Sequence, residues 1–174
     1  CEHTGLTPDI LVLGKALGGG VLPLAAVLVR SDLDVAPELA LGHYTHEKNP
    51  VLAAAALATL EVIENEGLVE NAAALGEYAL ARLQEIAASR RCIGEVRGQG
   101  LLIGVELVTA DGAPAAQLAE RVLYQALARG LSFKLTMQSV LTLSPPLIIR
   151  RDELDQALAI LSESLDAALA EGGR

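Results

Sequence analysis

Residues 9–29, DILVLGKALGGGVLPLAAVLV, are two short apolar runs that enclose one lysine and a glycine triplet. Brief runs rich in Val, Leu and Ile, flanked by Gly or Pro, are typical of buried β-strands. We therefore predict strands over 9–13 and 24–29, with a flexible loop at 18–20 between them. Because two strands alone do not make a stable buried sheet, we expect their neighbours to lie upstream of Cys1.

Lys15 follows the first apolar run, and no acidic residue lies between Ile10 and Arg30 to pair with it. A buried ammonium group without a partner is costly, and one escape is loss of its proton. A neutral amine held at the end of a strand is what an enzyme needs to form a Schiff base with an aldehyde cofactor. The alternative is a lysine that merely extends its amine into solvent, and this segment alone favours that alternative.

The remainder of the chain alternates between helix-like and strand-like segments. Asn49 and Pro50 are an N-cap and first-turn signal for a helix that stops at Gly67. The other predicted elements are a helix over 69–88, a hairpin turning at 98–100, a helix from Pro114 to Gly130, strands over 131–135 and 139–143, and a leucine-striped helix from Asp152. This order predicts an α/β protein whose second part is a small α+β domain with helices on one face of a sheet.

Composition excludes several classes of partner. Thirteen Lys and Arg against 22 Asp and Glu give a formal charge of -9, which repels nucleic acid and anionic lipid. No apolar stretch approaches the length of a membrane span, and the N-terminal segment lacks the pattern of a signal peptide. Cys1 and Cys92 fit neither a disulfide framework nor a metal site, so we expect reduced thiols in a cytoplasmic protein. Since the chain opens on Cys1 instead of Met, we expect it to be a fragment.

Four motifs, in order along the chain, carry a family resemblance. They are DILVLGKALGGGVLPLAAV, then GHYTHEKNP before an Ala-rich helix, then VRGQGLLIGVEL, and finally LSPPLIIRRDELDQAL. Together they resemble the C-terminal half of the class III aminotransferases, which are pyridoxal-phosphate (PLP) enzymes of fold type I. The resemblance implies that 1–66 is the last piece of the PLP-binding large domain, with the start of the bridging helix, and that 67–174 is the small C-terminal domain.

The resemblance also implies a role for three residues. Lys15 matches the lysine that forms the internal aldimine with PLP and then moves a proton between the substrate carbon and the cofactor. Thr45 matches the threonine whose hydroxyl and backbone N–H bind the cofactor phosphate in the neighbouring subunit of a homodimer, with the backbone of Tyr44 beside it. An ordinary loop cap is the alternative for Thr45. The residues indicate no metal site, since the cluster at 46–48 lacks a metal-ligand spacing.

The chain departs from the family pattern at the position before the PPL segment. Many members that act on α-amino acids carry an arginine there, and this chain has Thr142. A threonine cannot offer the charged, planar fork that holds a carboxylate. We therefore expect a different mode of substrate recognition, either of an amine without an α-carboxylate or through Lys134 or Arg97. An exposed strand lysine and a turn arginine are the ordinary explanations of those two residues.

The function that the resemblance implies is transfer of an amino group from a primary amine or amino acid to a 2-oxo acid. A lyase or an epimerase of the same family is the nearest alternative, which Thr142 keeps open. The family's aspartate that pairs with the cofactor's ring nitrogen would lie upstream of Cys1. We therefore expect this piece to be inactive alone, and a truncated or non-catalytic dimerisation module remains a third hypothesis.

Overall fold

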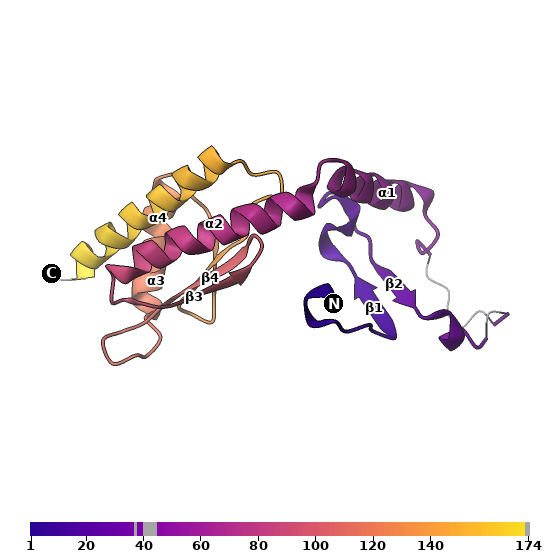
Figure 1. The fold of residues 1–174 in the computed structure, drawn as a ribbon, viewed down its shortest axis with the longest axis horizontal. Helices are drawn as coiled ribbons and strands as arrows, with labels where there is room; N and C mark the ends of the chain where they lie inside the picture. The colour runs from indigo at the N-terminus through magenta and orange to yellow at the C-terminus, as the bar shows by residue number, and fades with distance from the viewer. Residues whose placement is uncertain (37, 40–44, 173–174) are drawn as a thin grey trace. The chain divides into compact units, whose positions relative to one another are not determined.

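The computed structural model describes residues 1–36, 38–39 and 45–172 (Figure 1). The chain divides into two compact units, Cys1–Glu66 and Gly67–Arg174. Each unit has a sheet of its own, with two strands in the first unit and four in the second.

The first unit contains the two predicted strands and the predicted helix. Its elements are η1 (Glu2–Thr4), β1 (Ile10–Leu13), η2 (Lys15–Gly18), β2 (Ala26–Val29), η3 (Ser31–Leu33) and α1 (Pro50–Asn65). Asn49 caps α1, because its side-chain oxygen accepts a hydrogen bond from the Val51 N–H at 3.0 Å, and Pro50 occupies the first turn. The helix signal read from the sequence is therefore confirmed.

The strands β1 and β2 pair antiparallel, from Ile10 opposite Val29 to Leu13 opposite Ala26. Their side chains are largely exposed instead of buried as the apolar runs predicted, with Val12 69% exposed and Val27 60% exposed. Among the described residues of this unit the ladder has only two strands, and a ladder of that size cannot enclose its own side chains. The expectation of strands was right and that of burial was wrong for this chain.

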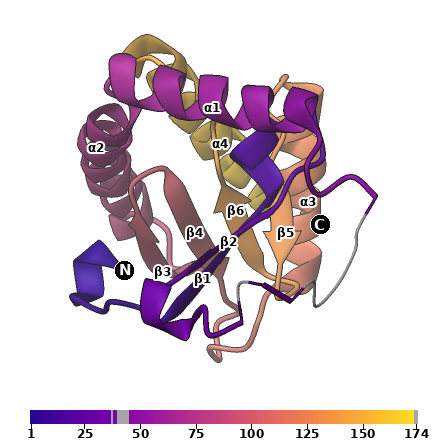
Figure 2. The ribbon, with the colours of Figure 1, turned by 90° about the vertical axis from the view of Figure 1, so that its right-hand side faces the viewer.

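The second unit is a four-stranded antiparallel sheet with three helices. Figure 2 shows its strands side by side in the order β3-β4-β6-β5. The strands are β3 (Ile93–Gln99), β4 (Leu102–Leu107), β5 (Lys134–Thr136) and β6 (Val140–Leu143), and the helices are α2 (Leu68–Ala88), α3 (Ala116–Ala128) and α4 (Arg151–Gly172). This is the predicted α+β arrangement.

One face of this sheet and the three helices enclose the core. Alternate residues of the strands point to this face, which is the pattern expected of a sheet covered on one side. The fully buried apolar side chains are aliphatic, and they include Val105 and Leu141 from the sheet, Leu83 from α2, Val122 from α3, and Leu161 and Leu165 from α4. Tyr78 and Phe133 pack against this aliphatic core and are only partly buried.

The leucine stripe of α4 behaves as its helical spacing predicts. Leu154, Leu158, Leu161 and Leu165 are buried, whereas Leu169 in a late turn is 40% exposed. At the start of the helix, the Glu153 carboxylate accepts a hydrogen bond from the Arg150 N–H at 2.9 Å, as in a capping box.

The turn between β3 and β4 lies one residue further along than the glycines of the sequence suggested. Gly98 is a strand residue opposite Ile103, and the chain turns at Gly100 and Leu101. Gly100 has a φ of +53°, and α2 passes so near that a Cβ placed on Gly76 would lie 2.3 Å from the Gly100 carbonyl oxygen. Glycine is therefore needed for space at position 76 and is favoured at position 100 by the left-handed backbone conformation.

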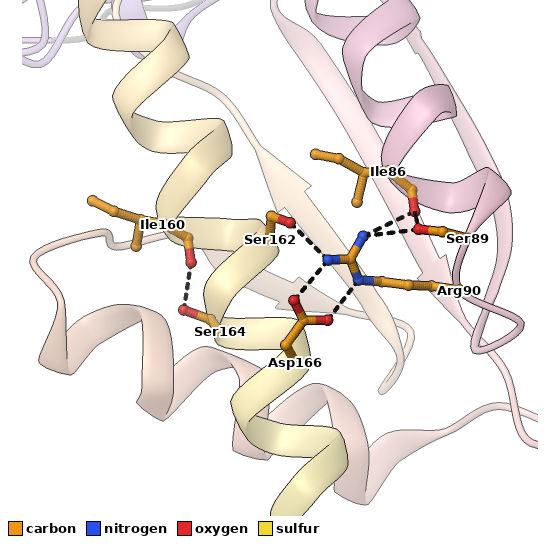
Figure 3. A network of polar contacts seen from close by, with 7 residues as sticks. All are labelled: Ile86, Ser89, Arg90, Ile160, Ser162, Ser164 and Asp166. Atoms are coloured by element: carbon orange, nitrogen blue, oxygen red, sulfur yellow. Dashed lines mark hydrogen bonds and ion pairs between the residues drawn. The ribbon is translucent and has the colours of Figure 1, made fainter.

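A polar network ties the end of α2 to α4, as Figure 3 shows. Arg90 donates from Nε and Nη2 to the two carboxylate oxygens of Asp166, at 2.9 and 2.8 Å, and from Nη2 to the Ser162 hydroxyl at 2.8 Å. Its Nη1 donates to the Ile86 carbonyl oxygen near the end of α2. The Arg90 side chain is only 14% exposed, so these bonds compensate the cost of burying its charge.

Candidate active site

Lys15 is the first residue of η2, separated from β1 by Gly14 alone. Its φ of +53° lies in the left-handed region, which costs a residue with a side chain about 1–2 kcal/mol. Residues held in this region cluster at functional sites, where the neighbouring structure keeps a side chain in place despite the strain. The backbone conformation of Lys15 is therefore a second feature, besides its side-chain chemistry, that is typical of residues at functional sites.

The Lys15 side chain is exposed, so the burial that the flanking apolar runs suggested is not found in this unit. The ion pairs described for the unit join Arg30 to Asp9 and Asp32. Among the described residues no carboxylate pairs with the lysine, in agreement with the lack of an acidic neighbour in the sequence. A primary amine without an ion-pair partner is the group that adds to an aldehyde.

The glycine loop after Lys15 packs on α1. Gly18 is buried, and Gly19 and Gly20 have φ values of +71° and +75°. A Cβ on Gly19 would lie 3.2 Å from Oγ1 of Thr59, whose hydroxyl donates to the Ala55 carbonyl oxygen at 2.8 Å. Helix α1 thus supports the segment that carries Lys15.

Thr45 is an exposed turn residue of the same unit, a few residues before α1. The residues after it, His46 to Lys48, are exposed as well, as expected for a solvated loop. Tyr44 and His43 lie outside the described residues. No hydrogen bond within the described ranges joins Thr45 to Lys15, so the phosphate-binding role of Thr45 and Tyr44 stays a prediction.

The three residues connected with substrate recognition lie in one row across the second sheet. Arg97 on β3 is opposite Gly104 on β4, Gly104 is opposite Thr142 on β6, and Thr142 is opposite Lys134 on β5. Residues directly opposite one another on neighbouring strands point to the same face. This face is the one away from the core, because the buried residues Ile103 and Leu141 alternate with the row. Strand pairing therefore places Arg97 on the same face of the sheet as Lys134 and Thr142, which lie more distantly along the sequence.

Arg97 contacts two carboxylates on this open face. Its Nη1 donates to Glu95 at 2.5 Å and to Glu106 at 2.7 Å. The hydrogen bond with Glu106 is the main cause that raises the pKa of the Arg97 guanidinium above its usual value, so the group stays cationic. Arg97 is therefore not the turn arginine bonded to backbone that the sequence allowed.

The sequence reading missed the hairpin turn between β5 and β6. Met137 and Gln138 have φ values of +48° and +68°, and together with Ser139 they form a three-residue connection between Thr136 and Val140. Neither Met nor Gln is a residue that favours a positive φ or a turn, so no local signal marked this connection.

No cluster of three or more His, Cys, Asp or Glu side chains able to hold a metal ion occurs among the residues that the structure describes. In the same ranges no helix is long and apolar enough to cross a membrane.

Comparison with known proteins places this chain in a family. The family model described as aminotransferase class-III matches residues 1–165. The chain belongs to the class III aminotransferases. This family is PLP-dependent, and the sequence resemblance to it is confirmed.

Curated members of the family that resemble the chain catalyse different reactions. The chain is 47% identical over 162 residues to an (R)-1-hydroxy-2-aminoethylphosphonate ammonia-lyase of Vibrio splendidus, covering 92% of the chain and 34% of that protein. It is 41% identical to a diaminobutyrate–2-oxoglutarate aminotransferase of Rhizobium meliloti, over 99% of the chain and 38% of that protein. It is 40% identical to a leucine/methionine racemase of Thermococcus litoralis, over 98% and 38%.

Solved structures of the family confirm the fold. The ornithine aminotransferase of Toxoplasma gondii, a structure with partial occupancy of PLP, matches with a TM-score of 0.89 and 31% identity, over 99% of this chain and 40% of that one. The chain is thus a mixed α/β piece of a class III aminotransferase fold. It spans between about a third and two fifths of the length of these relatives.

Proposed function

We propose that Lys15 is the residue to which PLP binds covalently, in an enzyme that transfers an amino group from a primary amine or amino acid to a 2-oxo acid. The observation that carries this proposal is the conformation of Lys15. Its amine is exposed and unpaired among the described residues, on a left-handed residue between a strand and a glycine loop, in a chain of a PLP-dependent family.

The described residues fit the cofactor in their chemistry. PLP needs an amine for its aldehyde and hydrogen-bond donors for its phosphate. Lys15 offers the amine and Thr45 an exposed hydroxyl. When bound, PLP supplies a ring that withdraws electrons from the substrate carbon.

In this proposal Lys15 has two tasks. Its Nζ would hold the cofactor until an amine substrate displaces it, and the freed amine would then take a proton from the substrate carbon and deliver it to the cofactor. The short connection from β1 through Gly14 limits how far this side chain can move. The Thr45 hydroxyl and N–H would donate to the cofactor phosphate, and these bonds would keep the cofactor in place while Lys15 is detached.

The assignment of the two units follows from the same proposal. We assign Cys1–Glu66 to the end of the PLP-binding large domain and Gly67–Arg174 to the small domain. The proposal includes a homodimer, in which Thr45 binds the cofactor phosphate of the neighbouring subunit. It also includes a cytoplasmic location. We further expect the 174-residue chain alone to be inactive, since it spans at most about two fifths of the relatives above.

A second candidate is elimination of ammonia from an amine that carries a phosphonate group. Thr142 favours it, because a neutral side chain stands where many members that act on α-amino acids have an arginine. The 47% identity to an ammonia-lyase whose substrate is an aminoethylphosphonate points the same way.

The test uses the complete protein that contains this chain, purified with PLP. We expect an absorption band near the visible edge that Lys15→Ala abolishes and Lys48→Ala, a substitution of another exposed lysine of this unit, leaves in place. A band that persists in the Lys15→Ala protein would mean that the cofactor is held elsewhere.

A screen of amine donors then separates the reactions. Transamination converts the cofactor to its amine form and yields the oxo acid, aldehyde or ketone that corresponds to the donor, which supports the first candidate. Release of ammonia with 2-aminoethylphosphonates and no net change in the cofactor spectrum would replace it by the second. Inversion of an amino acid without either product would assign an epimerase.

A further inference from the structure

A cleft of about 380 Å³ opens on the face of the second sheet that the helices do not cover. It is lined by Arg97, Gly104, Thr136, Met137, Val140 and Thr142, among others. Gly104 makes the room, because it stands between Arg97 and Thr142 in the cross-strand row and has no side chain. With neighbouring strands about 4.8 Å apart, the backbones of Arg97 and Thr142 are separated by roughly 10 Å across this gap.

Arg97 keeps one edge of its guanidinium free. Both of its ion pairs, with Glu95 and Glu106, use the same nitrogen, Nη1. Its Nε–H and Nη2–H donors have no protein partner in the described parts of the chain. These donors form the edge of the planar fork that bonds two oxygens of a carboxylate or a phosphonate in parallel.

The opposite wall of the cleft has a pair of hydroxyl groups. Oγ1 of Thr136 and Oγ1 of Thr142 lie 2.8 Å apart. One hydroxyl donates to the other, so the second keeps a proton for a further acceptor. A carboxylate has two oxygens, which the fork of Arg97 would occupy. A phosphonate has a third oxygen left for the hydroxyl.

The rim of the cleft is strained. Met137 lines it and, together with Gln138, forms the hairpin turn in which both residues have a positive φ. A turn of this type without glycine or asparagine is costly, and such strain persists where the surroundings have a use for the geometry. Beyond Thr142, Lys134 adds an exposed cation that offsets the carboxylate charge of Glu95 and Glu106.

We propose that this cleft binds the phosphonate group of a small organic phosphonate, with the Nε–Nη2 edge of Arg97 on two oxygens and the threonine hydroxyls on the third. This inference rests on the proposed function only in identifying the ligand as the substrate's anionic end. In place of an arginine at position 142, the anion would be held by side chains from three strands, β3, β5 and β6.

The test is a titration of the complete protein that contains this chain, prepared without PLP, with methylphosphonate, followed by NMR of the Arg97 Nε–H and the Thr136 and Thr142 methyl groups. We expect saturable shifts of these signals, with acetate binding more weakly by about tenfold because one acceptor oxygen is missing. Arg97→Lys, which loses the fork, and Thr142→Val, which loses a hydroxyl, should each weaken binding by about tenfold.

Arg150→Lys is the matched control, since Arg150 is an exposed arginine of the same unit that is also paired with two carboxylates. Its methylphosphonate affinity should stay that of the unsubstituted chain. The backbone spectrum of each variant reports folding, and if that of Arg97→Lys is altered throughout, Thr142→Val decides alone.

The inference is overturned if methylphosphonate gives no saturable shift, if acetate binds as well, or if the deciding variants bind like the control. None of these measurements involves PLP. A protein with the Lys15-dependent absorption band and no phosphonate binding would therefore contradict this inference alone, and the reverse result would contradict the proposed function alone.

Discussion

Replacing Gly76 by alanine should destabilise the Gly67–Arg174 unit, although alanine is the better helix former. A Cβ on Gly76 would lie 2.3, 2.4 and 2.6 Å from the carbonyl oxygen, carbonyl carbon and Cα of Gly100. All three are backbone atoms, so the helix or the β3–β4 turn must move by about 1 Å to restore ordinary contact. Such overpacking costs about 1–3 kcal/mol, and the rigid neighbours place this case near the upper end.

The gain in helix propensity offsets part of that cost. Alanine is more favourable than glycine inside a helix by about 1 kcal/mol. We therefore expect Gly76→Ala to lower the free energy of unfolding by about 2 kcal/mol. Ala74→Gly, at an exposed position of the same helix, is the control and should lose about 1 kcal/mol through propensity alone.

Urea unfolding followed by circular dichroism at 222 nm measures both variants, since the chain has no tryptophan to report by fluorescence. The slope of the transition should stay constant if only stability changes. An increase in stability for Gly76→Ala, equal in size to the loss for Ala74→Gly, would refute the close approach of α2 to the turn.

Three further outcomes are expected in the second unit. Asp166→Ala should lower the free energy of unfolding in urea by about 1–3 kcal/mol, because the mostly buried guanidinium of Arg90 loses the carboxylate that accepts two of its hydrogen bonds. Gln138→Gly should raise stability by about 1 kcal/mol by relieving a left-handed residue, and no gain in thermal unfolding would argue against the strained turn. Burial raises the pKa of the Cys92 thiol, so peptide mass spectrometry should find Cys92 alkylated by iodoacetamide more slowly than exposed Cys1 at pH 8.

Local signals in the sequence predicted most of the helices and strands. The helical spacing of Leu154, Leu158, Leu161 and Leu165 placed α4 and its buried face, and Asn49 with Pro50 marked the start of α1. These features depend on neighbours along the chain, so one sequence is sufficient to read them. The hairpin turn was misplaced because Gly98 signals a turn locally, whereas its actual role is the close approach of the next strand, with a Cβ there 2.6 Å from the Leu102 carbonyl oxygen.

Only part of the candidate site could be predicted from the sequence. Lys15 was proposed from the family resemblance and from its lack of an acidic neighbour, but its left-handed backbone could not be predicted, since no local rule places a lysine there. The row from Arg97 to Lys134 depends on strand pairing between distant segments, which composition and periodicity do not specify. The exposure of β1 and β2 was missed because apolar runs indicate what a side chain prefers and not what is available to cover it.

The uncovered ladder of β1 and β2 affects how this chain behaves in the test tube. Each of its strands has an outer edge without a described partner, and Val12 and Val27 are well exposed beside those edges. An open apolar edge is a template onto which a second molecule can add a strand. Preparations of the 174-residue chain should therefore lose material to aggregation as concentration rises, and dilute, cold handling with early removal of oligomers is the sensible practice.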